Sequence, residues 1–181
     1  MKNVFLCLGL LITLLITAFI SDSWVEFAVD NSLSVNLPAL PKTIVRDTVE
    51  PDGFAAHLRL SVTYDMFGRY DVTRDDLNHE SDDYLTSKGR KEWYSNGPIV
   101  EEAVNKAALL KKSSFNINKI DGMDYVYDLP ESESNQHTIK YMRHLLVGKV
   151  GYVFSFTPKD GLNTPCEEQK KHFFNSIRLK R

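Results

Sequence analysis

Cysteine is scarce in this sequence, and its two cysteines do not suit an internal disulfide. Cys7 lies within an apolar N-terminal run, and Cys166 lies near the other end of the chain. If the N-terminal run is removed, Cys166 has no partner in the chain, although exported compartments permit disulfides. A domain of about 150 residues buries enough surface to fold without such a bond. Stability is therefore expected to come from packing.

The sequence also lacks the short motifs of common enzyme chemistry. It has no G-x-S-x-G, no phosphate loop and no C-x-x-C, and His79-Glu80 does not continue as H-E-x-x-H. The histidines share no metal-ligand spacing; they are His57, His79, His137, His144 and His172. We therefore expect a noncatalytic protein without a cofactor.

A large excess of either charge is absent as well. The chain carries 22 basic and 24 acidic residues, a formal net charge of −2. Residues 1–21 contain Lys2 and no acid, so their removal makes the net charge −3. This balance gives no indication of a nucleic-acid partner.

The N-terminal segment "MKNVFLCLGLLITLLITAFIS" places Lys2 ahead of an apolar run. This pattern predicts that residues 1–21 are a signal peptide or an N-terminal membrane anchor, and that residues 22–181 form one globular domain. Cleavage after Ala18 would leave Ile16 at the outer recognition position, which is acceptable. Cleaved export is favoured, giving a periplasmic or secreted protein. The alternative is an anchor through residues 4–20 in the cytoplasmic membrane.

Alternation of apolar and polar residues predicts strands through most of the domain. A hairpin is expected from residues 27–29 and 33–37 around the turn at Asp30, followed by strands at 42–48, 114–129 and 138–159. The clearest strand is "AAHLRLSVTYD". Its apolar face is predicted to point into the core; that face consists of Leu58, Leu60, Val62 and Tyr64. A turn at Phe67-Gly68 then leads back through Tyr70 and Val72.

Helical periodicity replaces this alternation in two regions. One helix is predicted at residues 82–94, and a second from Pro98 to Lys112. The second is expected to bury a stripe of Val100, Ala103, Val104, Ala107 and Leu110 or Lys111. A third helix is predicted from about residue 165, capped by Thr164. It is expected to close the core with one face, formed by Cys166, Lys170, Phe173, Phe174 and Ile177.

Several stretches in this order resemble the PsbP-like family. They are the "W-x-x-F" hairpin ending in "VNLPALP", then "SFNINKIDGMDYVYDL", "GYVFSF" and the closing "FFNSIRLK". The family includes an extrinsic subunit of the photosynthetic oxygen-evolving complex, a nuclear-import factor that binds the Ran GTPase, and exported bacterial proteins of unknown role. This chain looks most like the last branch. The resemblance implies an α+β fold, an antiparallel β-sheet flanked by helices in an α/β/α sandwich, and a preference for protein partners.

Two stretches are candidate sites. Within the acidic loop 71–83, alternate residues resemble the first ligands of a calcium loop; they are Asp76, Asn78, Glu80 and Asp82. However, Ser81 replaces the usual glycine and Ser87 the last glutamate, so a solvated loop with Ser81 as a helix cap is favoured. The second candidate is a partner surface at the hairpin tip, where Met66 and Phe67 flank a glycine turn. Its alternative is that Phe67 folds back beneath a helix.

These observations lead to two functional hypotheses. The favoured one is an exported, noncatalytic binding module whose partner is another envelope protein. The alternative is a small-ligand-binding protein or an enzyme with a cleft between the sheet and the helices. Such a cleft is expected to gather polar side chains such as His57, Arg59 and Tyr125.

Overall fold

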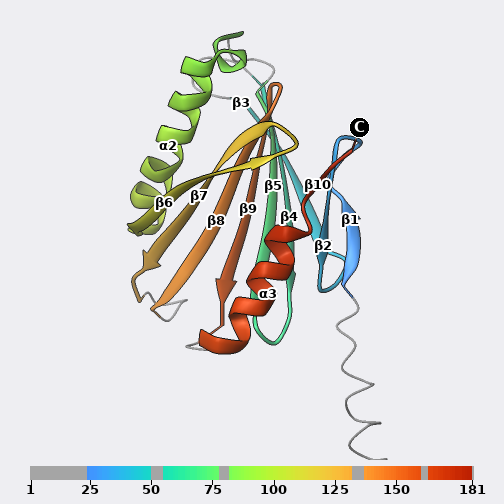
Figure 1. Cartoon of the computed structure of the whole chain (residues 1–181), viewed down its shortest axis with the longest axis vertical. Coiled ribbons are helices and arrows are strands. Elements are labelled where there is room, and N and C mark those ends of the chain that lie inside the picture. Colours follow the sequence, from blue (N-terminus) through green and yellow to red (C-terminus); the bar gives the residue numbers. More distant parts are fainter. Residues whose placement is uncertain (1–23, 50–54, 78–81, 132–136, 160–162, 181) are drawn as a thin grey trace, which may run out of the picture.

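The computed structural model describes residues 24–49, 55–77, 82–131, 137–159 and 163–180. Its centre is a seven-stranded antiparallel sheet in the order β3-β4-β5-β9-β8-β7-β6 (Figure 1). The strands are β3 (Lys42–Val49), β4 (Ala55–Tyr64), β5 (Gly68–Asp76), β6 (Ala108–Ile117), β7 (Ile120–Leu129), β8 (Thr138–Val147) and β9 (Val150–Pro158).

A smaller sheet brings the two ends of the domain together. Its order is β1-β2-β10, with β1 at Val25–Ala28, β2 at Leu33–Leu37 and β10 at Arg178–Leu179. The predicted first hairpin is confirmed, since β1 and β2 pair in antiparallel register. Asp30 fixes the turn because its Oδ1 accepts the backbone N–H groups of Ser32 and Leu33 at 2.7 and 2.9 Å. This is the hydrogen bonding expected of an Asp-initiated turn.

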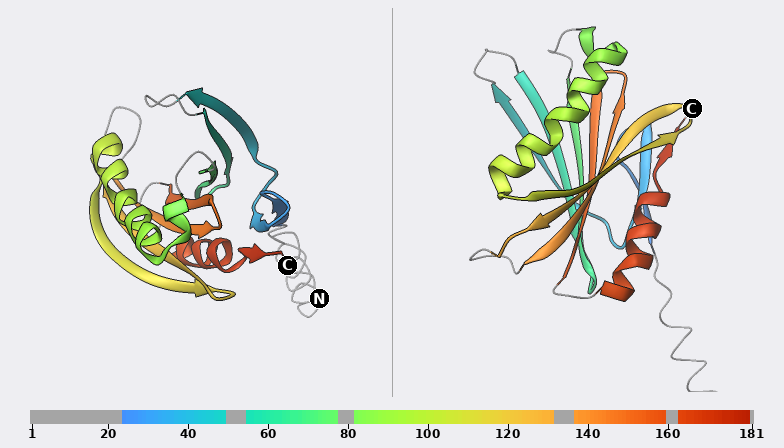
Figure 2. Two further views of the ribbon diagram at one scale, coloured as in Figure 1. Left: turned by 90° about the horizontal axis from the view of Figure 1, so that it is seen from above. Right: turned by 60° about the vertical axis from the view of Figure 1, so that its left-hand side comes forward.

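The two α-helices within the described ranges cover opposite faces of the large sheet, as the predicted α/β/α sandwich requires (Figure 2). They are α2 (Ser87–Asn105), which follows the short 3₁₀ helix η1 (Asp82–Leu85), and α3 (Asn163–Asn175). Neighbouring residues on a strand point to opposite faces. On β8, Arg143 donates to the Phe174 carbonyl of α3 at 3.0 Å, whereas His144 lies against Gly97 of α2. The α+β sandwich is therefore confirmed.

The main core lies between the large sheet, the small sheet and α3. Phe173 is fully buried and forms edge contacts with Tyr70 of β5 and Phe154 of β9, at ring-centroid distances of 5.4 and 6.3 Å. Cys166, Phe174 and Ile177 are also buried in this cluster. The C-terminal helix closes the core as predicted. The helix begins at Asn163, two residues earlier than predicted, so the expected cap Thr164 lies inside it, and the side chain of Thr164 is outside the described part of the chain.

The prediction of two separate helices before residue 112 is wrong, because α2 continues through Pro98. Proline has no N–H to donate to the carbonyl four residues earlier, which is usually costly inside a helix. Here that carbonyl, on Tyr94, accepts a hydrogen bond from the Tyr125 hydroxyl and a longer one of 3.4 Å from the Lys112 ammonium. Side chains from the sheet thus replace the donor that proline lacks.

The predicted buried stripe is also wrong. Ala107 is buried, but it lies beyond the helix, which ends where Lys106 adopts a left-handed φ of 53°. Val100 and Val104 on α2 are 59% and 73% exposed, and Leu110 belongs to the edge strand β6. Instead, α2 faces the sheet with its glycine, proline and tyrosine positions, which are the buried residues Gly89, Tyr94 and Pro98.

The prediction for β4 has its faces reversed. Ser61 and Thr63 are buried, at 2% and 6% exposure, because they pair across the strand with the core residues Val72 and Tyr70 of β5. The other face carries Leu58, Leu60 and Val62, which are half-buried or partly exposed, and Tyr64, which is 62% exposed. An apolar strand face is therefore left partly uncovered on the α2 side of the sheet.

Residues 1–21, the predicted signal or anchor, lie outside the described residues. Within the described ranges, none of the helices combines the length and apolar character needed to cross a membrane.

Candidate functional site

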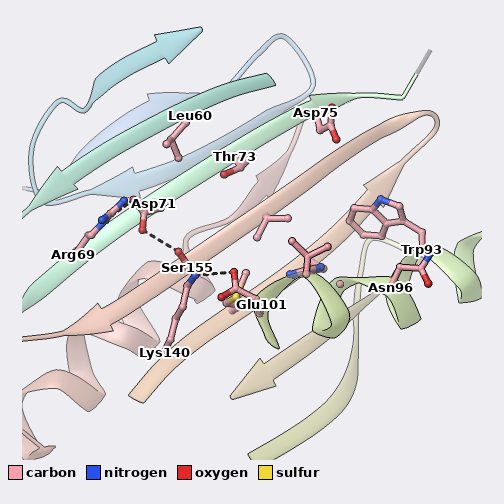
Figure 3. Close-up of a pocket in the computed structure, with 15 residues that line it drawn as sticks. Leu60, Arg69, Asp71, Thr73, Asp75, Trp93, Asn96, Glu101, Lys140 and Ser155 are labelled. Atoms are coloured by element: carbon pink, nitrogen blue, oxygen red, sulfur yellow. Dashed lines mark hydrogen bonds and ion pairs between the residues drawn. The ribbon is translucent and has the colours of Figure 1, made fainter. Parts of the chain in front are cut away.

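The partly uncovered face of the sheet and α2 enclose a groove, which we call the α2 groove (Figure 3). Its volume is about 410 Å³. The residues that line it come from α2 and from strands β4, β5, β8 and β9. The groove exists because α2 lies over β6 and β7 and does not extend across β4 and β5. A second pocket, of about 380 Å³, lies between the other face of the sheet and α3.

One part of the groove wall is apolar. It is formed by Leu60, Trp93, Val100, Met142 and Val153. The Trp93 ring is held against the backbone of Gly151, where an added Cβ would lie 2.8 Å from the ring. A larger residue than glycine at this position would displace the indole. The wall is therefore fixed at the end of the groove where Trp93 lies.

The opposite end of the groove contains two ion pairs (Figure 3). On β5, Arg69 Nε donates to Asp71 Oδ1 at 2.8 Å, and Ser155 Oγ of β9 donates to Asp71 Oδ2 at 3.1 Å. Lys140 of β8 donates to Glu101 of α2 at 2.9 Å. Its side chain and that of Glu101 are only 16% and 12% exposed, so this pair joins helix to sheet in a partly desolvated setting.

His144 is the buried titratable group of the groove. It is 5% exposed, and its Nε2 has no hydrogen-bond partner among the described residues. Burial and, to a smaller extent, the nearby ammonium groups of Lys140 and Lys112 together lower the pKa of His144 to about 3. The ring packs on Tyr125 at 4.7 Å and beside Trp93 at 5.6 Å between centroids. The imidazole is thus neutral at physiological pH.

The predicted calcium ligands are only partly described. Asn78 and Glu80 lie outside the described residues. Asp76 ends β5 and pairs with Arg74 at 2.5 Å, so the first part of the stretch 71–83 is a strand and not a loop. Asp82 is exposed and bonds to Lys149 at 2.5 Å, which lowers the pKa of the Asp82 carboxyl. Within the described ranges, no three His, Cys, Asp or Glu side chains are grouped as metal ligands. Calcium binding by this stretch stays the less favoured alternative, and Ser81, the residue expected to cap the next helix, lies outside the described residues.

The two residues of the predicted partner surface occupy different environments. Met66 is 73% exposed at the tip of the β4–β5 hairpin. Phe67 is half-buried and packs against the main core, and its carbonyl accepts from the Cys166 thiol at 3.6 Å. Burial raises the pKa of that thiol. A role for this tip in partner binding stays a prediction, with Met66 as the accessible residue.

The polar residues expected to meet in a cleft do not do so. His57 and Arg59 are exposed on β4, on the strand face that turns away from the α2 groove, and His57 bonds to Asp47 at 2.8 Å. The Tyr125 hydroxyl donates a hydrogen bond to the backbone carbonyl of Tyr94.

Sequence reasoning missed the charged residues that do line the groove. Asp71, Thr73 and Asp75 alternate with the apolar Tyr70 and Val72, and this alternation was a usable signal for a polar strand face. Glu101, Lys140 and His144 meet only through the β8–β9 register and the position of α2.

No family model matches this sequence, and no curated protein matches it. A solved structure does match: the solution structure of cyanobacterial PsbP (CyanoP) from Synechocystis sp. PCC 6803. The match has a TM-score of 0.56 at 10% sequence identity, and it covers 88% of this chain and 94% of the other. The chain therefore has a PsbP-like fold, as the sequence motifs predicted. Its place in the exported bacterial branch stays a prediction.

Proposed function

We propose that this chain is an exported, noncatalytic binding protein of the cell envelope, and that it binds another envelope protein through the α2 groove and the adjoining face of α2. The observation that carries this proposal is the outward-facing apolar surface of α2. Val100 and Val104 lie one helical turn apart and are 59% and 73% exposed. Contiguous apolar residues exposed beside a cleft are typical of interaction sites.

The polar groups of the groove support binding more than catalysis. A serine nucleophile needs a base within hydrogen-bond reach. Ser155 donates to Asp71 instead, and the Nε2 atom of His144 is not bonded to a hydroxyl in the described chain. Four of the charged side chains that line the groove form the pairs Arg69–Asp71 and Lys140–Glu101. These groups stabilise the shape of the groove.

Export is part of the proposal through residues 1–21, where a basic residue precedes an apolar run. The mature domain would then be periplasmic or secreted. If the segment is retained, residues 4–20 would hold the domain at the cytoplasmic membrane.

The proposal is tested by affinity capture from the organism's own envelope fraction after mild crosslinking, read by mass spectrometry. The bait chains are the parent, the double variant Val100→Ser with Val104→Ser, and Met66→Ser. Met66 is a matched control because it is as exposed as Val104, at 73%, but lies on the distant hairpin tip. We expect a specific partner that the parent and Met66→Ser capture and the double variant does not.

Two outcomes would count against this assignment. Loss of the partner with Met66→Ser alone would place the binding surface at the hairpin tip. Capture of no specific protein by the parent, while another exported binding protein succeeds in the same procedure, would contradict a protein-binding role.

The second candidate is a small-ligand-binding protein or an enzyme that uses a cleft. It is favoured by one observation, the volume of about 410 Å³ between the sheet and α2, which lies within the range of small-molecule sites. Native mass spectrometry of the purified chain would reveal a molecule that remains bound through purification.

A further inference from the structure

The pocket between the large sheet and α3 is separate from the α2 groove, and we call it the α3 pocket. Its volume is about 380 Å³, which lies within the range of small-molecule sites. Its lining comes from β6, β7 and β8 on one side and from α3 on the other. Arg143 of β8 lines the α3 pocket and the next residue, His144, lines the α2 groove. The two sites therefore lie on opposite faces of the sheet.

The acids of the α3 pocket are paired with bases that line the same pocket. Both carboxylate oxygens of Asp124 accept hydrogen bonds from Arg143, from Nε at 2.8 Å and from Nη2 at 2.9 Å. Glu167 accepts from Lys170, which lies one turn further along α3. Within the described chain, no other carboxylate lines the pocket. The charges of these two pairs cancel.

Two further lysines leave the pocket with an excess of positive charge. Lys111 belongs to β6 and Lys171 to α3, and neither forms an ion pair within the described ranges. Among the acids nearby, Asp128 of β7 pairs with His137, and Glu168 of α3 lines a separate hollow beside β2. Four bases and two acids thus line the α3 pocket, which gives it a formal charge of +2.

The pocket also offers apolar surface and hydroxyl groups beside this charge. Val126, Tyr141 and Phe174 line it. The Arg143 guanidinium lies over the Phe174 ring, 5.1 Å from its centroid, so the positive charge adjoins an aromatic surface. The hydroxyls of Ser113 and Tyr141 line the pocket as well, and neither donates a hydrogen bond to a described residue. This mixture of apolar surface with a few polar groups is typical of small-molecule sites.

From these observations we propose that the α3 pocket binds a small organic dianion with an apolar body. One anionic group faces Lys111 on the sheet and the other faces Lys171 on the helix. The apolar body lies against Val126, Tyr141 and Phe174. Both lysines can bind an anionic group without breaking an ion pair of the described chain. The site is independent of the proposed function, which places an envelope protein at α2.

The test uses three probes with one ring and two, one or no negative charges at pH 7: isophthalate, benzoate and benzamide. Each is titrated into the purified, ¹⁵N-labelled full chain in nonionic detergent at low ionic strength and followed by two-dimensional ¹H–¹⁵N NMR. We expect saturable shifts for isophthalate at the backbone amides of Ser113, Val126 and Lys171. The affinity should fall about fivefold for each charge removed, since two opposite unit charges 4 Å apart attract by about 1 kcal/mol in water.

Three variants test the role of the two unpaired lysines. Lys111→Gln and Lys171→Gln should each lower the affinity for isophthalate about fivefold and leave the weak binding of benzamide unchanged. Lys91→Gln is the control, because Lys91 is exposed on α2 and forms no ion pair within the described ranges. This variant makes the same change in net charge away from the pocket, and it should change the affinity by less than about twofold.

A pair of neighbouring serines on β6 locates the site by bulk. Ser113 and Ser114 are both exposed, and they point to opposite faces of the strand. Ser113 lines the α3 pocket and Ser114 does not. We expect Ser113→Trp to abolish the isophthalate shifts and Ser114→Trp to leave them. The lysine variants add no bulk, so they keep the test valid if a tryptophan disturbs β6.

The inference is overturned if isophthalate gives no saturable shifts, if benzamide binds as tightly as isophthalate, or if Lys91→Gln weakens binding as much as Lys111→Gln does. Shifts that persist in Ser113→Trp would place the dianion elsewhere and reject the site as well. These results are separable from those of partner capture, whose variants lie on α2 and at the hairpin tip. A captured envelope protein without dianion binding would support the proposed function and reject the ligand site, and the opposite pair of results would do the reverse.

Discussion

The Tyr152 hydroxyl donates to Asp30 Oδ2 at 2.6 Å across a sequence separation of 122 residues. Asp30 Oδ2 also accepts from Arg74 Nε at 2.8 Å, while Oδ1 holds the turn of the first hairpin. One carboxylate thus links the small sheet to β5 and β9 at the centre of the large sheet. Its side chain is 17% exposed, and that of Arg74 is 18% exposed.

Asp30→Ala is expected to destabilise the fold by about 3 kcal/mol, because Arg74 and Tyr152 would each lose a shielded acceptor. Burial works to raise the pKa of Asp30, but the hydrogen bonds from Tyr152 and Arg74 outweigh it, so the pKa is lowered. The ionised Asp30 carboxylate therefore stabilises the fold fully above pH 3.8, the ordinary pKa of an aspartate. This stabilisation is lost as the pH falls through the lowered pKa that Asp30 has in the folded state. Urea denaturation at pH 7 measures the loss.

Asp47→Ala is the control, since Asp47 is 69% exposed and contacts only the surface residue His57 in the described ion pairs. It should change the free energy of unfolding by less than about 0.5 kcal/mol. Equal effects of the two changes would show that Asp30 does not link the sheets energetically.

The stability of the fold should fall as the pH drops from about 6.5 towards 3 because of His144. Its pKa is lowered to about 3 in the folded state, so in this range the unfolded chain binds one more proton than the folded chain does. The expected loss is about 1.4 kcal/mol per pH unit for this group. It is measured as the difference between the parent and His144→Phe in denaturation at pH 7, 6 and 5.

At pH 7, His144→Phe should be nearly neutral, because a ring of similar shape replaces one whose buried Nε2 has no described partner. The exposed His57→Phe should retain the full pH dependence of the parent. If His144→Phe also retains it, the imidazole is not held neutral by the fold.

Gly97→Ala should destabilise the protein by about 1–3 kcal/mol, although the same change in an exposed helix interior is normally favourable by up to about 1 kcal/mol. An added Cβ would lie 2.8 Å from His144 Cε1 and 3.0 Å from Nδ1. Thermal and urea denaturation measure the effect, and the exposed Ser95→Ala is the control. The stability lost through Gly97→Ala should be smaller when His144 is also changed to Ala, because the imidazole ring is then absent. An equal loss in that background would contradict a contact between residue 97 and His144.

Phe67→Ser should cost about 2 kcal/mol, whereas Met66→Ser should change stability by less than about 0.5 kcal/mol. Phe67 packs against the main core, and Met66 is 73% exposed. Denaturation of both variants checks this. This difference in stability determines which variant suits partner capture. A double change of Met66 and Phe67 would remove partner contacts and also destabilise the fold, so a lost partner could not be assigned to either cause. Similar costs at the two positions would contradict the packing of Phe67.

The sequence pattern predicted the elements whose periodicity agrees with their burial. The face of α3 that contains Phe173 and Phe174 is both helical in spacing and buried, and alternate apolar residues of β2 and β9, such as Leu33 and Phe154, are buried as predicted. The pattern failed at α2, where apolar residues such as Val104 face outward and the buried contacts come from Gly89, Tyr94 and Pro98. The apolar spacing of this helix lies on its exposed side, so the rule that an apolar stripe faces the core gave the wrong buried face.

The candidate site could be predicted only in part, because its residues come from four strands and a helix. The alternation of Asp71, Thr73 and Asp75 along β5 marks a polar strand face. Whether that face is solvated or lines a cleft depends on where α2 ends, and this depends on the left-handed turn at Lys106. Local sequence does not fix the register that brings His144 beneath Gly97.

The position of β2 between β1 and β10 has a consequence for how the chain folds. Leu33 of β2 is completely buried and pairs with Leu179 near the C-terminus, and the centre of the large sheet joins β5 to β9. β2 and β5 therefore each gain their second neighbour only after most of the polypeptide has been synthesised. Such long-range pairing slows folding. Both sheets are therefore incomplete until β9 and β10 have been synthesised, and a chain without its full fold is the state that the proposed export through a narrow secretion channel would require.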